Sequence, residues 1–239
     1  KWRNVNMIWG YNTSYLGLFF IVMIFSVVAQ FRVNSTFKKY SKFANSKGLT
    51  GAEVARQMLN ASGISDVRVE RVAGSLTDHY DPTHKVLRLS ESVYSSQSVA
   101  ALGVAAHETG HAIQHAEHYS FLWLRSAVVP LSNIGSNLSI PLVMIGLLIN
   151  GSLSYYLILA GVLLFSLVVI FTLVTLPVEF DASRRALYML ENQSYLYDSE
   201  LNGAKKVLTA AAMTYVAAAA TAIVNLLRLF SLLSTRNKD

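Results

Sequence analysis

The sequence contains no cysteine and few charged residues, and both features restrict the class of protein to which it can belong. Without cysteine, the chain has neither disulfide bonds nor thiolate metal ligands. Charged residues make up 14% of the chain, against roughly 25% in soluble proteins, whereas 53% of the residues are hydrophobic. Residues 4–31 and 126–178 contain no Asp, Glu, Lys, Arg or His. These gaps exclude a soluble globular protein and predict an integral membrane protein.

The two uncharged gaps are long enough for membrane spans, which need about 20 apolar residues each. We expect residues 1–31 to form an N-terminal segment with a retained transmembrane anchor, since no small-x-small cleavage site follows the apolar run. Residues 126–178 fit a transmembrane hairpin that turns near Asn150. Residues 206–239 form an apolar helix that either spans the membrane or packs against the spans. The expected fold is mainly α, with three to four transmembrane helices.

The sequence pattern of residues 32–125 predicts a small soluble α+β domain between the two uncharged segments. Thr50 and Glu53 have the spacing of a capping box. The segments DVRVERV and HKVLRLS alternate between apolar and polar residues, as half-buried strands do. From about Ser98 a helical pattern resumes and carries most of the histidines.

Basic residues gather next to the predicted spans. Arg32 and three nearby lysines follow the first span. An excess of Lys and Arg marks the cytoplasmic side of a span. We therefore expect residues 32–125, and a helix at residues 179–205, on the cytoplasmic side of a multi-pass protein in the cell membrane. The net charge of +6 is attributed to topology and lipid headgroups, and not to nucleic acid.

One short segment, VAAHETGHAIQHAEH at residues 104–118, concentrates four histidines and two glutamates. Its residues His107, Glu108 and His111 form an H-E-x-x-H motif. Residues four apart on a helix share a face, so both imidazoles can bind one ion. Zinc accepts neutral histidine nitrogen and keeps an open position for water in catalytic sites. Glu108 projects about 100° round the helix from His107, where it can accept a proton from that water.

Two histidines leave a catalytic zinc site incomplete, since such sites have three protein ligands. The predicted hairpin returns the chain to the side of the membrane that it left, and the segment PVEFDAS follows there. Glu179 is therefore the candidate third ligand, although a glutamate at the start of a helix is also favoured by the helix dipole. Asp181 and Ser183 are candidate partners of the ligands. His115 is poorly directed, because one straight helix does not easily wrap three residues round one ion.

Other residues near the motif have candidate roles in substrate binding. In the segment LTDHYDP, Asp78, His79, Tyr80 and Asp81 could form a turn network. Alternatively, His79 or Tyr80 could donate a hydrogen bond to the oxyanion. The segment HKVLRLS precedes the histidine helix much as an edge strand does, and it could bind an extended substrate by strand addition. The residues of that expected edge strand are Val86, Leu87, Arg88 and Leu89.

The segments LTDHYDP, VLRLSE, AAHETGHAIQHA and PVEFDAS, in this order between the hydrophobic stretches, resemble those of the YugP-type bacterial membrane zinc metallopeptidases. The resemblance covers about residues 33–233. It implies a gluzincin-like endopeptidase of the bacterial cell membrane with a zincin-like α+β domain. It also implies one zinc ion per chain held by His107, His111 and Glu179, with Glu108 as the base. The distantly similar HtpX-type proteases carry an aspartate where this chain has Ser183.

The expected function is hydrolysis of peptide bonds in membrane or membrane-proximal proteins by zinc-activated water. The alternative is a non-catalytic zinc-binding scaffold or assembly subunit, although a structural site gains nothing from a glutamate inside the histidine pair. A metal transporter would need ionisable residues within its spans, and the predicted hairpin has none. The expected partners are protein or peptide substrates and the lipid bilayer. A second copy of the chain, in a homo-oligomer, and another membrane protein are further candidate partners.

Overall fold

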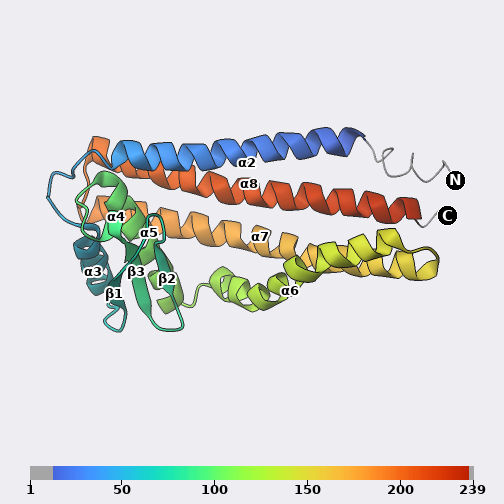
Figure 1. Ribbon diagram of the computed structural model, residues 1–239. Coiled ribbons are helices and arrows are strands. Elements are labelled where there is room, and N and C mark those ends of the chain that lie inside the picture. Colours follow the sequence, from blue (N-terminus) through green and yellow to red (C-terminus); the bar gives the residue numbers. More distant parts are fainter. Residues whose placement is uncertain (1–12, 237–239) are drawn as a thin grey trace. The chain divides into compact units, whose positions relative to one another are not determined.

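The computed structural model describes residues 13–236, and the earlier part of the expected N-terminal segment lies outside this range. The chain is mainly helical with one small sheet, which confirms the expected fold class (Figure 1). The helices and strands, in chain order, are α2 (Thr13–Tyr40), α3 (Gly51–Ala61), β1 (Arg68–Val72), β2 (His79–Asp81), β3 (Val86–Ser90), α4 (Glu91–Tyr94), α5 (Val99–Ala116), α6 (Ser120–Leu148), α7 (Ser152–Asn192) and α8 (Asp198–Arg236). Within the described range, α2, α6, α7 and α8 are long and apolar enough to cross a membrane.

The described chain divides into two compact units. One unit comprises residues 29–123 and 176–214, and it contains the sheet together with α3, α4 and α5. The other comprises residues 124–175, the described residues up to 28, and residues 215–236. Helices α2, α7 and α8 each contribute one part to each unit, because their bounds cross the division.

The sheet has three strands in the order β1-β3-β2, so β3 is the central strand. β1 pairs with β3 in parallel, with Arg68 opposite Val86. β2 pairs with β3 antiparallel, with His79 opposite Arg88. The two open edges of the sheet therefore belong to β1 and β2.

The prediction that Val86, Leu87, Arg88 and Leu89 form an edge strand is wrong. Both edges of β3 are paired, and the side chains of Val86, Leu87 and Leu89 are fully buried. The covering strand is β2, which has three residues within a turn-rich segment. Three residues are too few for an alternating pattern to be recognised in the sequence. β3 is thus a core strand, and no substrate can pair with it.

The core of the first unit lies between α3, α5 and the sheet. The predicted capping box is confirmed: the Thr50 hydroxyl accepts from the Glu53 N–H at 3.3 Å, and the Glu53 carboxylate accepts from the Thr50 N–H at 2.8 Å. Met58 of α3, Leu87 of β3 and Leu102 of α5 are fully buried in one apolar cluster. Full burial of each such side chain contributes about 1.5–3 kcal/mol. This packing fixes α5, the helix that carries the histidines, against the sheet.

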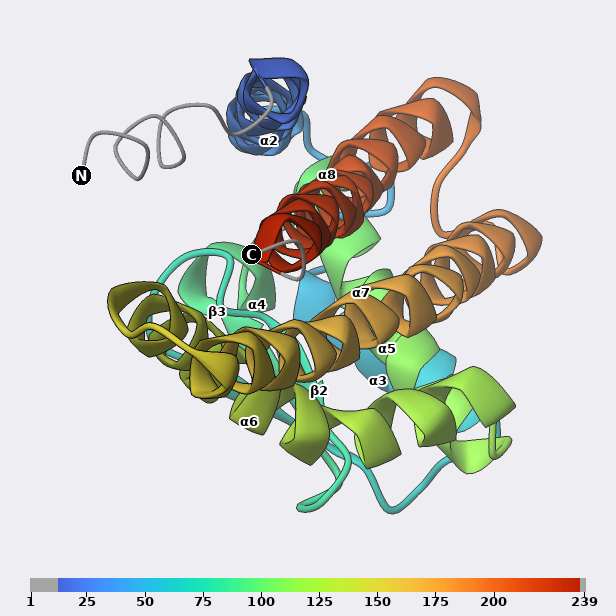
Figure 2. The ribbon, with the colours of Figure 1, turned by 90° about the vertical axis from the view of Figure 1, so that its right-hand side faces the viewer.

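In the second unit, α6 and α7 form a helical hairpin with its turn at residues 149–151 (Figure 1, Figure 2). Gly151 in the turn has a φ of +86°, which glycine adopts without a steric cost. The two helices meet at small residues. A Cβ atom added to Gly161 would lie 2.7 Å from the carbonyl oxygen of Ser139. Helix backbones approach this closely in membrane proteins where glycine, alanine and serine line the contact.

Helix α7 differs from expectation at Pro177. The sequence predicts a helix that starts near Glu179, whereas α7 runs unbroken from Ser152 to Asn192. Proline removes one backbone donor, but membrane helices tolerate it because other groups satisfy the freed carbonyl. Residues 179–205 are therefore the end of α7, a turn and the start of α8, and not one separate helix. As a result, Glu179 lies on the same helix as the apolar stretch that precedes it.

The contact inside the hairpin generates the first prediction. Gly161→Ala should destabilise the protein by about 1–3 kcal/mol, because the added methyl group meets the backbone of α6 and the helices must move apart. Thermal unfolding of the detergent-solubilised protein measures the effect. Gly17→Ala is the matched control, because a Cβ atom added to Gly17 in α2 meets nothing within 4 Å. Equal melting temperatures for the two variants would contradict this packing.

Candidate metal centre

Helix α5 positions the two histidines of the H-E-x-x-H motif. The helix starts after Ser98, whose hydroxyl accepts a hydrogen bond from the Ala101 N–H at 3.1 Å. The helix formers that follow continue it without a break to Ala116. His107 and His111 lie one turn apart, and the centroids of their rings are 4.8 Å apart. The spacing in the sequence thus places both imidazoles on one face.

A close contact between α5 and α7 brings the third residue to this face. A Cβ atom added to Gly110 would lie 2.6 Å from the carbonyl oxygen of Ala182, which is too close for any side chain without movement. Gly110 stands between the two histidines, and Ala182 stands three residues after Glu179. The glycine therefore lets the backbones of the two helices approach at the level of the site.

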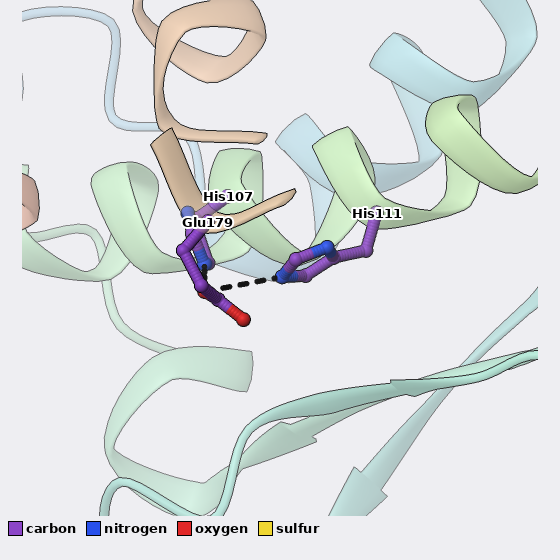
Figure 3. A group of neighbouring side chains, drawn as sticks. All are labelled: His107, His111 and Glu179. Atoms are coloured by element: carbon purple, nitrogen blue, oxygen red, sulfur yellow. Dashed lines mark ion pairs between the residues drawn. The ribbon is translucent and has the colours of Figure 1, made fainter. Parts of the chain in front are cut away.

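His107, His111 and Glu179 form a cluster in which the candidate ligand atoms all lie within 4.8 Å of one another. Figure 3 shows both imidazoles turned toward the Glu179 carboxylate. The Oε2 atom of Glu179 lies 3.3 Å from Nε2 of His107 and 3.6 Å from Nε2 of His111. Glu179 and His111 are buried, and His107 is largely so, with a side chain 13% exposed.

Negative charge dominates the electrostatics of this cluster. Burial by itself would lower the pKa of His111, but the contact with the Glu179 carboxylate and the charges of Glu108 and Glu179 outweigh it and raise the pKa. Burial raises the pKa of the nearby Asp78 carboxyl, and the charge of Glu108 adds to that rise. Such surroundings favour a cation. Glu108 is buried, and its side chain forms no hydrogen bond or ion pair within residues 13–236.

The two ring nitrogens that face away from Glu179 have partners of their own. Nδ1 of His107 lies 3.1 Å from the Ser183 hydroxyl, and Nδ1 of His111 lies 3.0 Å from Oε1 of Gln114. The Gln114 amide group donates to the Asp181 carboxylate at 2.9 Å. Asp181 in turn accepts from Arg184 and Arg185. Ser183 is thus in direct contact with a histidine, whereas Asp181 reaches one only through Gln114.

Gln114 was absent from the sequence-based candidates, although a signal for it exists. His107, His111 and Gln114 are spaced i, i+4 and i+7, which places them on one helix face. A glutamine on the face of the histidines, in a helix that is otherwise rich in apolar residues, is a candidate partner for them. Its bonds, however, join it to residues that are more than 60 positions away, and no pattern within α5 indicates these.

The residues expected to bind the oxyanion lie on β2 and have local partners. The Tyr80 hydroxyl lies 2.8 Å from Nδ1 of His115, so His115 is engaged there and is not part of the metal cluster. Burial raises the pKa of Tyr80 to about 12, which keeps the phenol protonated and able to donate. Nδ1 of His79 lies 2.8 Å from the Thr77 carbonyl oxygen, and His79 is exposed. Donation to an oxyanion by either residue stays a prediction.

The segment around β2 does contain a turn network. The Asp81 carboxylate accepts from the backbone N–H groups of Thr83 and His84 and from the side chain of Arg88. These bonds lower the pKa of Asp81, with the Arg88 bond the largest cause. Arg88 of β3 therefore stabilises the turn between β2 and β3 through its bond to Asp81.

The donor set fits zinc. Zinc binds histidine nitrogen and carboxylate oxygen at about 2.0–2.2 Å, so two ligand atoms of a tetrahedral site lie about 3.4 Å apart. The distances of 3.3 Å and 3.6 Å between the nitrogen atoms and Oε2 match this spacing. Both histidines offer Nε2 and bond through Nδ1 to another side chain, as metal-binding histidines do. His107, His111 and Glu179 would therefore hold the ion.

The fold and this centre define a zinc metallopeptidase, which is a hydrolase. The family model described as "Putative neutral zinc metallopeptidase" matches residues 15–234, nearly the whole chain, and the protein belongs to this family. It is 52% identical over 200 residues to "Putative membrane protease YugP" of Bacillus subtilis (strain 168), a match that covers 84% of this chain and 88% of that protein. No solved structure matches the chain significantly. The resemblance found in the sequence is thereby confirmed, and so is a membrane protein with several candidate spans.

The ligand set generates the second prediction. Glu179→Ala should lower bound zinc well below one ion per chain, because it removes the one carboxylate of the cluster. His115→Ala is the control and should leave the zinc content unchanged, since His115 bonds Tyr80 instead. Elemental analysis of the purified, detergent-solubilised variants measures the ratio of zinc to protein. Loss of zinc in His115→Ala together with its retention in Glu179→Ala would exclude this ligand set.

Proposed function

We propose that the protein is an integral membrane endopeptidase that cuts membrane or membrane-proximal proteins at a single zinc site per chain. His107, His111 and Glu179 hold the ion, and Glu108 is the general base. The observation that carries this proposal is the position of Glu179. It lies in α7 directly after Val178, the last residue of the uncharged stretch, which is one residue or about 1.5 Å along the helix axis. A site built on this residue acts on peptide segments close to the membrane.

Glu108 is suited to move the proton of the reaction. Zinc, when bound, supplies Lewis-acid polarisation of the substrate carbonyl and of the attacking water. Glu108 directly follows His107 in α5, and its carboxylate has no competing hydrogen bond within the described residues. It accepts a proton from water during attack and delivers it to the leaving amine. A scaffold protein with a purely structural zinc site would have no use for this unengaged carboxylate.

An extended substrate can pair with the open edge of β2. Only β1 and β2 have an unpaired side in the described sheet, and β2 contacts α5 through the bond between Tyr80 and His115. A peptide added antiparallel to an edge strand gains main-chain hydrogen bonds whatever its side chains are. This mode of binding suits an enzyme that accepts varied protein segments.

The active site is proposed to face the cytoplasm. Residues 32–47 contain five basic side chains and no acidic one, and Arg184 and Arg185 follow Glu179 in α7. The turn of the hairpin at residues 149–151 has no charged residue. Lys and Arg accumulate on the cytoplasmic side of bacterial spans, so the basic segments and the metal centre lie on that side.

The catalytic proposal generates the third prediction. Glu108→Gln should keep one zinc ion per chain but lose peptidase activity by about 10²–10⁴-fold, because it removes the base and no ligand. Cleavage of a mixed peptide library, read by mass spectrometry, measures the activity on many peptide sequences at once. Glu91→Gln is the control, since Glu91 pairs with Arg71 on the surface. Undiminished cleavage by Glu108→Gln would rule out Glu108 as the base.

The proposed orientation of the protein in the membrane generates the fourth prediction. Because the chain has no cysteine, single introduced cysteines are the only thiols in it. Single cysteines at Ser46 and Asn192 should resist a membrane-impermeant thiol reagent in intact cells, whereas a cysteine at Ser152 should react. All three positions are exposed in the structure. Permeabilised cells provide the control, in which all three should react. Labelling of Ser46 and Ser152 from the same side of intact cells would disprove the proposed topology.

A further inference from the structure

Gln114 is a fully buried amide whose hydrogen-bonding groups all have partners. Its Nε2 donates to the Val178 carbonyl oxygen at 2.8 Å and to Oδ2 of Asp181 at 2.9 Å. Its Oε1 lies 3.0 Å from Nδ1 of His111. A buried amide without partners would cost several kcal/mol, so these three contacts are what permits a glutamine at this position. One side chain thereby connects a candidate ligand in α5 with the residues on both sides of Glu179 in α7.

The partners of Gln114 fix the orientation of its amide group. A carbonyl oxygen and a carboxylate only accept hydrogen bonds, so the NH₂ group must face Val178 and Asp181. The carboxylate of Asp181 is held in place by Arg184 and Arg185. The opposite side of the amide, Oε1, is therefore directed at His111 and cannot exchange places with the nitrogen.

A fixed amide oxygen determines the tautomer of His111. Oε1 only accepts, so Nδ1 of His111 must carry the proton and donate it. A neutral imidazole with its proton on Nδ1 has its lone pair on Nε2. Nε2 is the atom that lies 3.6 Å from Glu179 and completes the cluster. His107 has no equivalent constraint, since the hydroxyl of Ser183 can either donate or accept.

We propose that Gln114 is a positioning residue for the metal, which presents Nε2 of His111 to zinc and holds α5 against the segment of α7 that carries Glu179. The inference rests on the proposed zinc site. It adds a residue that binds no ion and touches no substrate, yet determines how tightly the ion is held. Partners of this kind typically change metal affinity by 10- to 100-fold.

The first test replaces the amide by a side chain of similar size without hydrogen bonds. Gln114→Met in the full-length, detergent-solubilised protein should bind zinc about 10- to 100-fold more weakly, as measured by competition with a chelator. Thr109→Val is the matched control, because Thr109 is equally buried in α5 and its hydroxyl bonds only to Ala105 of the same helix. The visible spectrum of the cobalt-substituted protein should change in Gln114→Met and not in Thr109→Val.

A second pair of variants separates positioning from packing. Gln114→Glu keeps an acceptor for His111 but sets a carboxylate against Asp181, so it should also weaken zinc binding. Adding Asp181→Asn replaces that repulsion by an amide donor and should recover most of the affinity, with Asp181→Asn alone measured to complete the cycle. A residue that only fills space would show no such recovery.

The outcomes distinguish this inference from the proposed function. Wild-type affinity and cobalt spectrum in Gln114→Met, when the wild-type protein binds zinc, would overturn the role of Gln114 and leave the zinc site intact. A wild-type protein that binds no zinc would overturn the proposed site and this inference together. If Gln114→Met does not fold, equal zinc affinity of Gln114→Glu with and without Asp181→Asn overturns the inference.

Discussion

The contact between α5 and α7 at Gly110 determines the geometry of the metal centre. Gly110 lies between the two histidines, and the carbonyl group of Ala182 would lie only 2.6 Å from any Cβ atom there. Because the two backbones touch at this level, Glu179 reaches both imidazoles at distances of 3.3 Å and 3.6 Å. Zinc tolerates little variation in these distances, since its bonds to nitrogen and oxygen are about 2.0–2.2 Å long. A side chain as small as a methyl group at position 110 would separate the ligands.

The sequence predicts the parts of this centre that one helix or one topological rule determines. His107 and His111 follow from their four-residue spacing, because the geometry of a helix brings such residues to one face. Glu179 follows from a coarser argument, that a hairpin of two spans returns the chain to its starting side. That argument selects a segment and not a side chain. Within the segment, Glu179 is the first ionisable residue after the uncharged stretch, and it is the residue that lies in the cluster with the two histidines.

The features that the sequence did not predict depend on contacts between residues that are distant in the chain, and local sequence patterns do not encode such contacts. β3 looks like an edge strand in the sequence, because the strand that covers its second side, β2, is three residues long. Pro177 looks like a helix boundary, because its tolerance depends on the surroundings of α7. Gln114 looks like an ordinary polar residue in the sequence, because its hydrogen-bond partners Val178 and Asp181 are 64 and 67 positions away.

Buried negative charge connects the metal with the fold. Glu108 and Glu179 are both buried, and burial already raises the pKa of the neighbouring Asp78. Burying carboxylates is costly unless a positive charge compensates them, and a divalent cation between α5 and α7 would do so. The free energy of zinc binding would then also stabilise the packing of these helices. Since α7 continues unbroken from its apolar stretch to Glu179, an ion held by His107, His111 and Glu179 would join α5 to this helix. Under the proposed function, this link would set the distance of the active site from the end of the apolar stretch, and with it the substrate segments that reach the site.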